Sequence, residues 1–108
     1  MLRSESRRSD DMHFRFEAPL WLYEGAGAWH FITVPTEIAN VIREVRGPFA
    51  RGFGSLRVSA TVGQTRWNTS IFPDAKSGSC MLPVKKQVRV VERLAERDLV
   101  DVLLELTD

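Results

Sequence analysis

Hydrophobic and polar residues alternate along three segments of the chain, which is typical of strands with one buried face. The first segment is HFRFEA, residues 13–18, and Pro19 is expected to end it. The second and third segments, residues 56–62 and 65–72, are separated only by a short turn that begins at Gly63. Such a short turn between two alternating segments predicts a hairpin.

Two further apolar runs each end at a proline. WHFITV, residues 29–34, is a continuous run of aromatic and β-branched residues followed by Pro35, and it predicts a strand covered on both faces. SCMLP, residues 79–83, predicts a short strand that its own proline stops. LVDVLLEL, residues 99–106, predicts a closing strand.

An amphipathic helix is predicted directly after each of these prolines. In the first helix, apolar residues recur with helical spacing at Ile38, Val41, Ile42 and Val45. The second helix, in VKKQVRVVERL, has an apolar face made of Val84, Val88, Val91 and Leu94. Its Lys85, Lys86 and Arg89 point away from that face.

The sequence of strand, proline and short helix therefore occurs twice, around Pro35 and Pro83, which predicts two similar halves. Together the patterns indicate a mainly β domain of about six strands with two short helices. Short alternating strands in this number close best as a barrel whose ends the helices cap. We therefore expect a small pseudo-symmetric β-barrel.

Length and composition predict the extent of the domain and the cellular compartment of the protein. A chain of 108 residues accommodates one domain with one core. Residues 1–11 are rich in Ser and mixed charge and predict a disordered tail, so the domain is expected over residues 12–108. No apolar run resembles a signal peptide or spans a bilayer, and Cys80 is the only cysteine. We expect a cytoplasmic protein with no internal disulfide and no membrane partner.

The residues give little support for catalysis. A nucleophile such as Ser70 or Cys80 would need a neighbouring base, yet the only histidines, His13 and His30, lie in predicted strands outside any nucleophile motif. Two histidines and one cysteine at unrelated spacings match no metal-binding pattern. We therefore expect no catalytic residue, no metal site and no cofactor.

Basic residues are unevenly distributed. Eleven Lys or Arg residues but only four acids lie between Arg43 and Arg97. Lys85, Lys86 and Arg89 fall at the start of the second predicted helix, where they oppose the partial positive charge of the helix N-terminus. A bound anion would remove that conflict. A plain solvated surface is the competing interpretation, because exposed like charges cost only a few tenths of a kcal/mol.

Several motifs resemble one known family. They are W-x-T-S-I-F-P at residues 67–73, Ser77-Gly78, and L-P-V-K-K-x-V-R at residues 82–89, preceded by FRFEAPLW and GAWHFITVP. Over residues 13–107 the chain resembles an uncharacterised bacterial and archaeal domain family that occurs alone or fused ahead of a YdeI/OmpD-associated domain. The resemblance implies a double-split β-barrel like that of the swapped-hairpin AbrB/MazE group of DNA-binding proteins. It implies no established activity.

The chain departs from that family pattern at three positions. Cys80 stands where an aromatic residue is usual, and Asn68 stands where the residue is often basic. Arg97 precedes Asp98 where a Gly-Asp pair is usual. If the position requires a positive φ, Arg97 costs roughly 1 kcal/mol there because it carries a Cβ atom, and Arg97→Gly is then expected to stabilise the protein.

These observations favour a non-enzymatic binding domain, a monomer or weak dimer, that offers a basic surface to an anionic ligand or nucleic acid. The candidate ligand-binding residues are Arg66, Trp67, Ser70, Lys85, Lys86 and Arg89. A first alternative is a small-molecule binding protein or cryptic enzyme with a pocket at the barrel end, lined by Trp29, Trp67 and Phe72. Core packing is the competing interpretation of those aromatic residues. A second alternative is a protein-interaction module that uses a free sheet edge.

Overall fold

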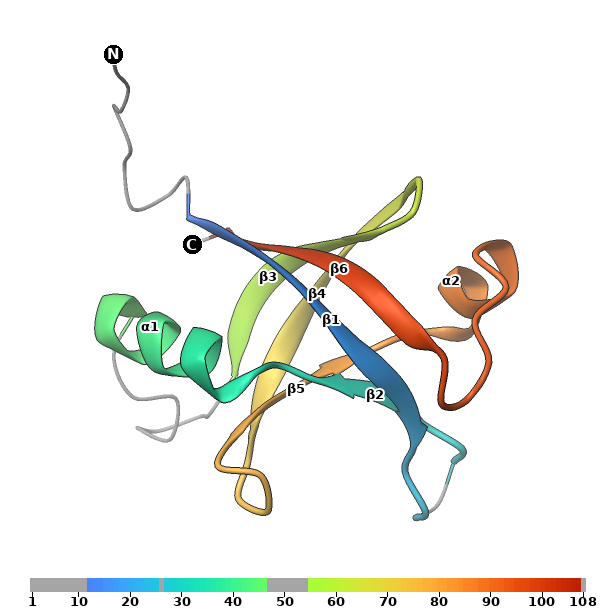
Figure 1. Ribbon diagram of the computed structural model, residues 1–108, viewed down its shortest axis with the longest axis horizontal. Helices are drawn as coiled ribbons and strands as arrows, with labels where there is room; N and C mark the ends of the chain where they lie inside the picture. Colours follow the sequence, from blue (N-terminus) through green and yellow to red (C-terminus); the bar gives the residue numbers. More distant parts are fainter. Residues whose placement is uncertain (1–11, 26, 47–54, 108) are drawn as a thin grey trace.

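The computed structural model describes residues 12–25, 27–46 and 55–107, and the predicted tail at residues 1–11 lies outside this range. The elements follow one another along the chain as Figure 1 shows. They are β1 (His13–Leu22), β2 (His30–Thr33), α1 (Thr36–Arg46), β3 (Leu56–Val62), β4 (Thr65–Asp74), β5 (Ser79–Pro83), α2 (Lys86–Val91) and β6 (Leu99–Leu106).

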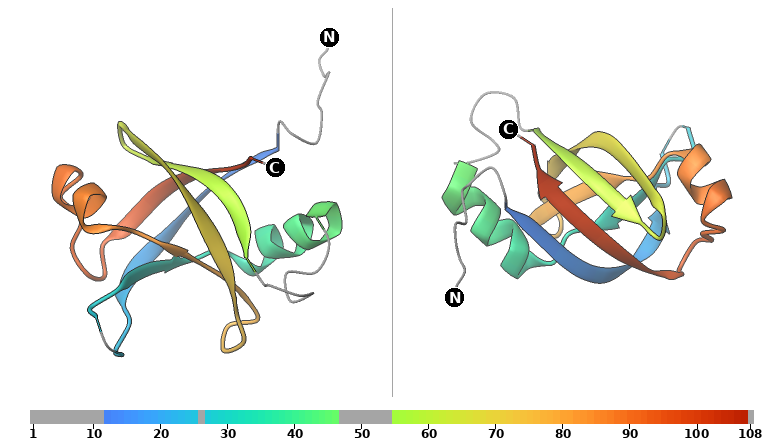
Figure 2. Two further views of the ribbon diagram at one scale, coloured as in Figure 1. Left: turned by 180° about the vertical axis from the view of Figure 1, so that it is seen from behind. Right: turned by 90° about the horizontal axis from the view of Figure 1, so that it is seen from above.

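The six strands form a closed antiparallel barrel in the order β1-β2-β5-β4-β3-β6 (Figure 2). This confirms the predicted mainly β barrel with two helices. The pairing also repeats between the two halves of the chain. β1 pairs with β6 from His13 to Pro19, and β3 pairs with β4 from Leu56 to Val62. Each half thus contributes two strands, a helix and a further strand, as the repeated pattern predicted.

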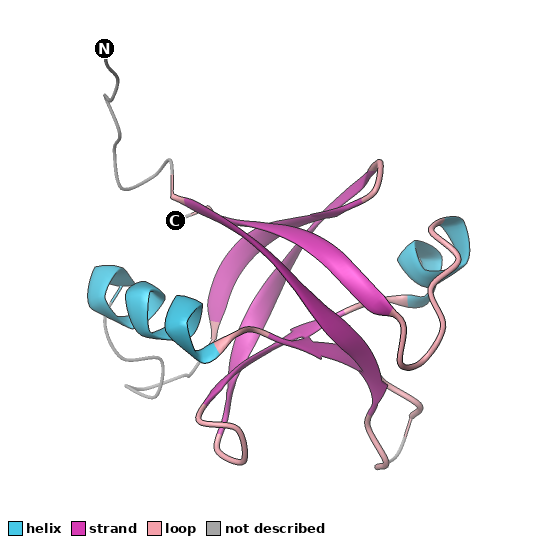
Figure 3. Ribbon diagram, viewed as in Figure 1, coloured by secondary structure: helices cyan, strands magenta, loops and turns pink. Residues whose placement is uncertain are grey.

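The barrel is split in two places. β1 pairs with β2 only over Leu20–Leu22, and β4 pairs with β5 only over Phe72–Asp74. Beyond those short ladders the strands of each pair diverge, and a helix follows β2 and β5 at opposite ends of the barrel (Figure 3). α1 buries Ala39 and Ile42 in the core, whereas the shorter α2 buries Val88.

The core consists of the inward-facing residues of the strands together with these helix residues. Trp67 is 7% exposed and belongs to it, as the alternation in β4 predicted. Each large apolar side chain buried in this way contributes roughly 1.5–3 kcal/mol. The largest fully buried side chains include Leu20, Ile32, Ile42, Ile71, Leu82 and Leu104.

The prediction that Pro19 ends the first strand is wrong. Pro19 forms the last register pair with β6, opposite Leu99, and β1 then continues to Leu22 along β2. The strand tolerates a residue without an N–H group at this point because the ladder changes partner there. The prediction that Pro83 ends β5 is confirmed.

The second helix is shorter than predicted. α2 ends at Val91, which is 67% exposed and not part of an apolar helix face. The backbone N–H of Leu94 donates to the carbonyl of Arg89, and Arg93 has a φ of 57°. These two features form a Schellman motif, which turns the chain out of the helix.

The sequence predicted that both faces of β2 are covered, but the outer face is partly exposed. Ile32 and Val34 are buried, but Trp29 is 55% exposed and Phe31 is half-buried. Core packing is therefore wrong for Trp29 and also for Phe72, which is 40% exposed, although it is right for Trp67.

Neither of the two described helices has the length and apolar character needed to cross a membrane.

Candidate functional site

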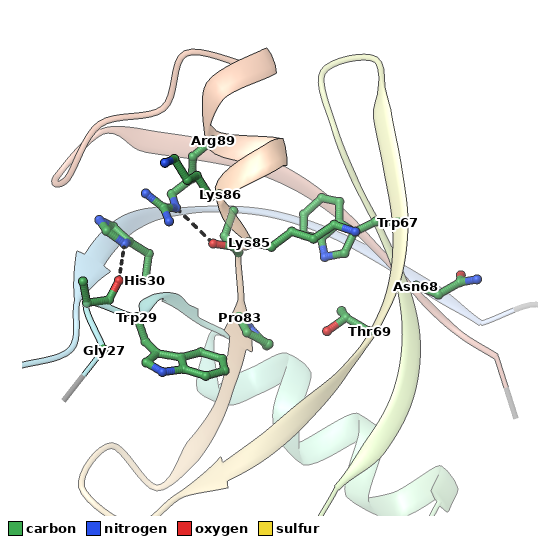
Figure 4. Close-up of a pocket in the computed structure, with 12 residues that line it drawn as sticks. Gly27, Trp29, His30, Trp67, Asn68, Thr69, Pro83, Lys85, Lys86 and Arg89 are labelled. Atoms are coloured by element: carbon green, nitrogen blue, oxygen red, sulfur yellow. Dashed lines mark hydrogen bonds between the residues drawn. The ribbon is translucent and has the colours of Figure 1, made fainter. Parts of the chain in front are cut away.

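A pocket of about 290 Å³ lies beside the split between β4 and β5, and we call it the basic pocket (Figure 4). The residues of β4 before Phe72 pair with β3 and not with β5. No ladder therefore joins this part of β4 to the segment between β5 and α2. The β1–β2 loop forms the remaining wall. The lining residues are Gly27, Ala28, Trp29, His30, Trp67, Asn68, Thr69, Pro83, Val84, Lys85, Lys86 and Arg89.

The charged residues that line the basic pocket are all cationic. Lys85, Lys86 and Arg89 carry positive charge, and none of the described lining residues is acidic. In the view of Figure 4, Lys86 and Arg89 lie at one end of the pocket and Trp29 lies at the other. The pocket therefore combines positive charge with an aromatic surface.

Two hydrogen bonds fix parts of this lining. The Arg89 Nε–H donates to the backbone oxygen of Val84 at 3.1 Å, which holds the guanidinium close to the start of α2. The His30 Nδ1 atom lies 3.2 Å from the backbone oxygen of Ala28. Lys85, the residue at the helix N-cap, makes no side-chain cap bond and is exposed, as Lys86 is.

The structure brings four of the six sequence-predicted site residues together. Trp67, Lys85, Lys86 and Arg89 all line the basic pocket, and the buried Trp67 closes it toward the barrel interior. Ser70 lines a separate, neighbouring depression of about 310 Å³.

Arg66 lines neither of these two pockets. Its Nη1 atom lies 3.3 Å from Oε1 of Glu105, a residue of β6. Arg66 directly precedes the inward-facing Trp67, so strand alternation places it on the outer face of the barrel. The structure therefore separates Arg66 from the other candidate residues.

The structure groups Trp29 and Phe72, two of the three aromatic residues predicted to line a ligand pocket, with three further apolar residues that were not predicted. Tyr23, Trp29, Phe31, Phe72 and Met81 line a depression of about 350 Å³, and we call these five residues the aromatic face. The rings of Trp29 and Phe31 are nearly parallel, at 10°, with centroids 6.1 Å apart. Alternation within residues 29–34 was the available signal, because it places Trp29, Phe31 and Thr33 on the side opposite Ile32.

The aromatic face adjoins the basic pocket through a shared side chain. Trp29 lines the basic pocket, the aromatic face and the depression that holds Ser70. That third depression also contains Arg57, Asn68 and Thr69. Positive charge, hydrogen-bonding groups and aromatic rings are therefore neighbours on one side of the molecule.

The structure offers little for nucleophilic or metal chemistry. Burial raises the pKa of the Cys80 thiol to about 11, so at neutral pH it is a protonated core residue and not a nucleophile. Among the described residues, no group of three or more His, Cys, Asp or Glu side chains is placed to hold a metal ion.

The model of the family described as "Domain of unknown function (DUF1905)" matches residues 16–104. The chain belongs to this family. The DUF1905 match includes every residue that lines the basic pocket and the aromatic face. No curated protein matches the chain. Because the DUF1905 description gives no activity, the function has to be argued from the geometry of the site.

Proposed function

We propose that this DUF1905 domain is a non-enzymatic binding domain whose basic pocket holds the anionic part of a ligand, with nucleic acid as the expected ligand. The observation that carries the proposal is the lining of the pocket. Three cationic side chains and a histidine share it, and no described lining residue supplies a compensating carboxylate. An anion bound there would gain from every one of these charges.

The local structure favours an anion further. Lys85 and Lys86 occupy the N-cap and first position of α2, where they add to the partial positive charge of the first backbone N–H groups. Arg89 presents a planar guanidinium, whose several N–H donors suit the oxygen atoms of a phosphate or carboxylate. Binding an anion relieves the repulsion among these groups.

The shape of the pocket favours a polymer over an enclosed small molecule. Lys85, Lys86, Asn68 and Trp29 are all exposed, so the pocket is an open cleft at the surface. An open basic surface suits a chain of phosphates that enters and leaves the site. The resemblance to swapped-hairpin DNA-binding proteins points the same way, as an analogy of fold.

A salt titration tests the proposal. We expect a fluorescently labelled DNA strand to bind more tightly at about 50 mM than at about 200 mM salt, because phosphate contacts release counterions. A Lys85→Gln/Lys86→Gln variant is expected to bind more weakly and to reduce the slope of log affinity against log salt by about 0.7 for each charge removed. Fluorescence anisotropy at several salt concentrations measures both quantities.

The control is Arg15→Gln, which removes one exposed positive charge from β1 and breaks its ion pair with Asp101. Arg15 does not line the basic pocket, so this variant should keep the salt slope of the unmodified protein. Absence of binding to both single-stranded and duplex DNA at about 50 mM salt would reject nucleic acid as the ligand.

A small anionic molecule is the second candidate ligand, because the basic pocket of about 290 Å³ is close to the lower end of ligand-pocket volumes, roughly 300 Å³. A thermal-shift screen with nucleotides, sugar phosphates and amphiphiles distinguishes it. A rise in Tm with a mononucleotide that is lost in Lys85→Gln/Lys86→Gln, without any DNA binding, would favour the small molecule.

A further inference from the structure

We propose that the ligand is single-stranded nucleic acid and that the aromatic face is its base-stacking surface, with the phosphates bound at the basic pocket. The inference deepens the proposed function and rests on it. It arises from a separate observation, namely the group of outward-facing aromatic rings beside the cationic cleft.

The exposure of these rings is the first step. Trp29 is 55% exposed, Tyr23 is 49% exposed and Phe72 is 40% exposed, although all three are large apolar or amphipathic side chains. Soluble monomers rarely gather such residues on one face unless the face binds something. The rings come from the β1–β2 connection, β2 and β4, so the fold brings them together from distant parts of the sequence.

The second step is that Tyr23, Trp29 and Phe31 contact one another through Phe31 before any ligand arrives. Phe31 makes ring contacts with Trp29, with Tyr23 at 6.2 Å in an edge-on arrangement, and with Trp21 at 5.3 Å. Trp21 is itself anchored, because its Nε1–H donates to the Thr33 hydroxyl at 2.9 Å. A stacking surface that is already ordered loses little conformational entropy on binding.

The third step is charge complementarity across the shared Trp29. On one side of Trp29 lie the cations of the basic pocket, and on another lie Arg57, Asn68 and Ser70. None of the described residues that line these two pockets or the aromatic face is acidic. A strand of phosphates and bases carries both negative charge and flat π faces, so it matches both parts of this surface.

A single strand fits better than a duplex. In a duplex the base faces are stacked on one another and cannot reach Trp29 or Phe72, whereas an unpaired strand exposes them. A mononucleotide could engage only part of a surface that covers three adjoining depressions. We therefore expect affinity to rise with length up to a site of roughly 4–16 nucleotides.

The experiment compares three labelled ligands by fluorescence anisotropy at low salt. They are an oligothymidylate of about 12 nucleotides, an abasic deoxyribose phosphate oligomer of equal length, and a hairpin duplex. The abasic oligomer carries the phosphates without the bases. We expect the oligothymidylate to bind at least about fivefold more tightly than either of the other two, since each stacked base adds a factor of about 5 or more.

Substitutions of exposed rings provide the matched test. Phe72→Ala, which lies outside the basic pocket, should weaken oligothymidylate binding by about fivefold or more and leave abasic-oligomer binding nearly unchanged. Trp29→Ala should weaken oligothymidylate binding by more than it weakens abasic-oligomer binding, because Trp29 also lines the basic pocket. Leu99→Ala is the control, because Leu99 is 65% exposed but lines neither the aromatic face nor the basic pocket. Trp29→Phe keeps an aromatic ring and should retain most of the oligothymidylate binding, which keeps the test valid if an alanine variant fails to fold.

The outcomes separate this inference from the proposed function. Equal, salt-sensitive affinity for the oligothymidylate and the abasic oligomer would overturn base stacking while leaving the anion-binding function intact. Loss of binding to all three ligands would overturn both. Binding to anionic lipid vesicles, weakened by Trp29→Ala and without oligonucleotide binding, would identify a membrane surface as the occupant of the aromatic face and overturn this inference.

Discussion

Arg97 adopts a backbone conformation that glycine adopts far more easily. Its φ is 80°, so the condition under which Arg97 was expected to be strained is met. Two backbone bonds hold the segment there, from the Arg97 N–H to the Leu20 carbonyl at 2.7 Å and from the Leu20 N–H to the Asp98 carbonyl at 2.9 Å. The connection to β6 is thus fixed to β1, and the strain at Arg97 is retained in the folded state.

Replacing Arg97 by glycine should therefore stabilise the protein. Relief of left-handed strain is worth about 1 kcal/mol or more, and the extra freedom of glycine in the unfolded chain offsets part of it. We expect a gain of about 0.5–1 kcal/mol and a Tm higher by about 2–4 °C. Thermal unfolding followed by circular dichroism measures the change. Arg97→Ala is the control and should give no gain, because alanine keeps the Cβ atom. An unchanged or lower Tm for the glycine variant would contradict this argument.

The free energy of unfolding should depend on pH through the buried Cys80 thiol. Its side chain is fully buried, and burial raises the pKa of its thiol from the ordinary 9.0 to about 11. Between those two values the unfolded chain loses the thiol proton while the folded protein keeps it, so stability falls as the pH rises through this window. Below pH 9 both states are protonated and the contribution is fully present.

The effect of Cys80 is measured by comparing the free energies of unfolding of the unmodified protein and the Cys80→Ala variant. The free energy of unfolding of the unmodified chain minus that of Cys80→Ala should fall by about 2 to 3 kcal/mol as the pH rises from about 8 to about 11. Taking the difference cancels the titration of lysine and tyrosine residues that the two proteins share. Urea unfolding at four or five pH values provides the data, and a difference that stays constant with pH would show that the thiol titrates normally.

At the scale of the elements, periodicity predicted the strands because most of them have one buried and one solvated face. At β2 the apolar run predicted the strand but not its exposed face, since the outward Trp29 and Phe31 are as apolar as the inward Ile32 and the run has no alternation in polarity. Periodicity failed at the end of α2 because Arg93, with a φ of 57°, occupies a position where glycine would have marked the helix end.

The candidate site was also only partly predictable from local sequence patterns. Lys85, Lys86 and Arg89 are close together in the sequence, so their shared location could be predicted from charge alone. Trp29 reaches them only because β2 pairs with β5, with Phe31 opposite Pro83. Such long-range register depends on the whole barrel, which a local pattern cannot specify. The sequence therefore named Trp29 and Phe72 as pocket candidates, but the position of Trp29 beside the basic residues became visible only in the folded chain.

At the scale of the whole molecule, the two halves depend on each other for four of the six ladders of the barrel. β1 pairs with β6, β3 with β4, β2 with β5 and β3 with β6, and each of these pairs joins a strand of the first half to a strand of the second. Only the short β1–β2 and β4–β5 ladders lie within one half. Neither half can bury its core residues without the other, so the domain should unfold as a single unit.

The register pair between Ile32 and Leu82 tests this directly, because it joins the two halves at the centre of the β2–β5 ladder and both side chains are 0% exposed. Ile32→Ala and Leu82→Ala should each lower the free energy of unfolding by about 2–5 kcal/mol, since each leaves a cavity in the shared core. Either substitution should shift the transitions seen by circular dichroism and by tryptophan fluorescence together. Val91→Ala, at a 67% exposed site, should shift neither by more than about 0.5 kcal/mol. Two separate transitions in the Leu82→Ala protein would show instead that the halves unfold independently. The basic pocket contains residues of both halves, so it would then be lost in the first transition.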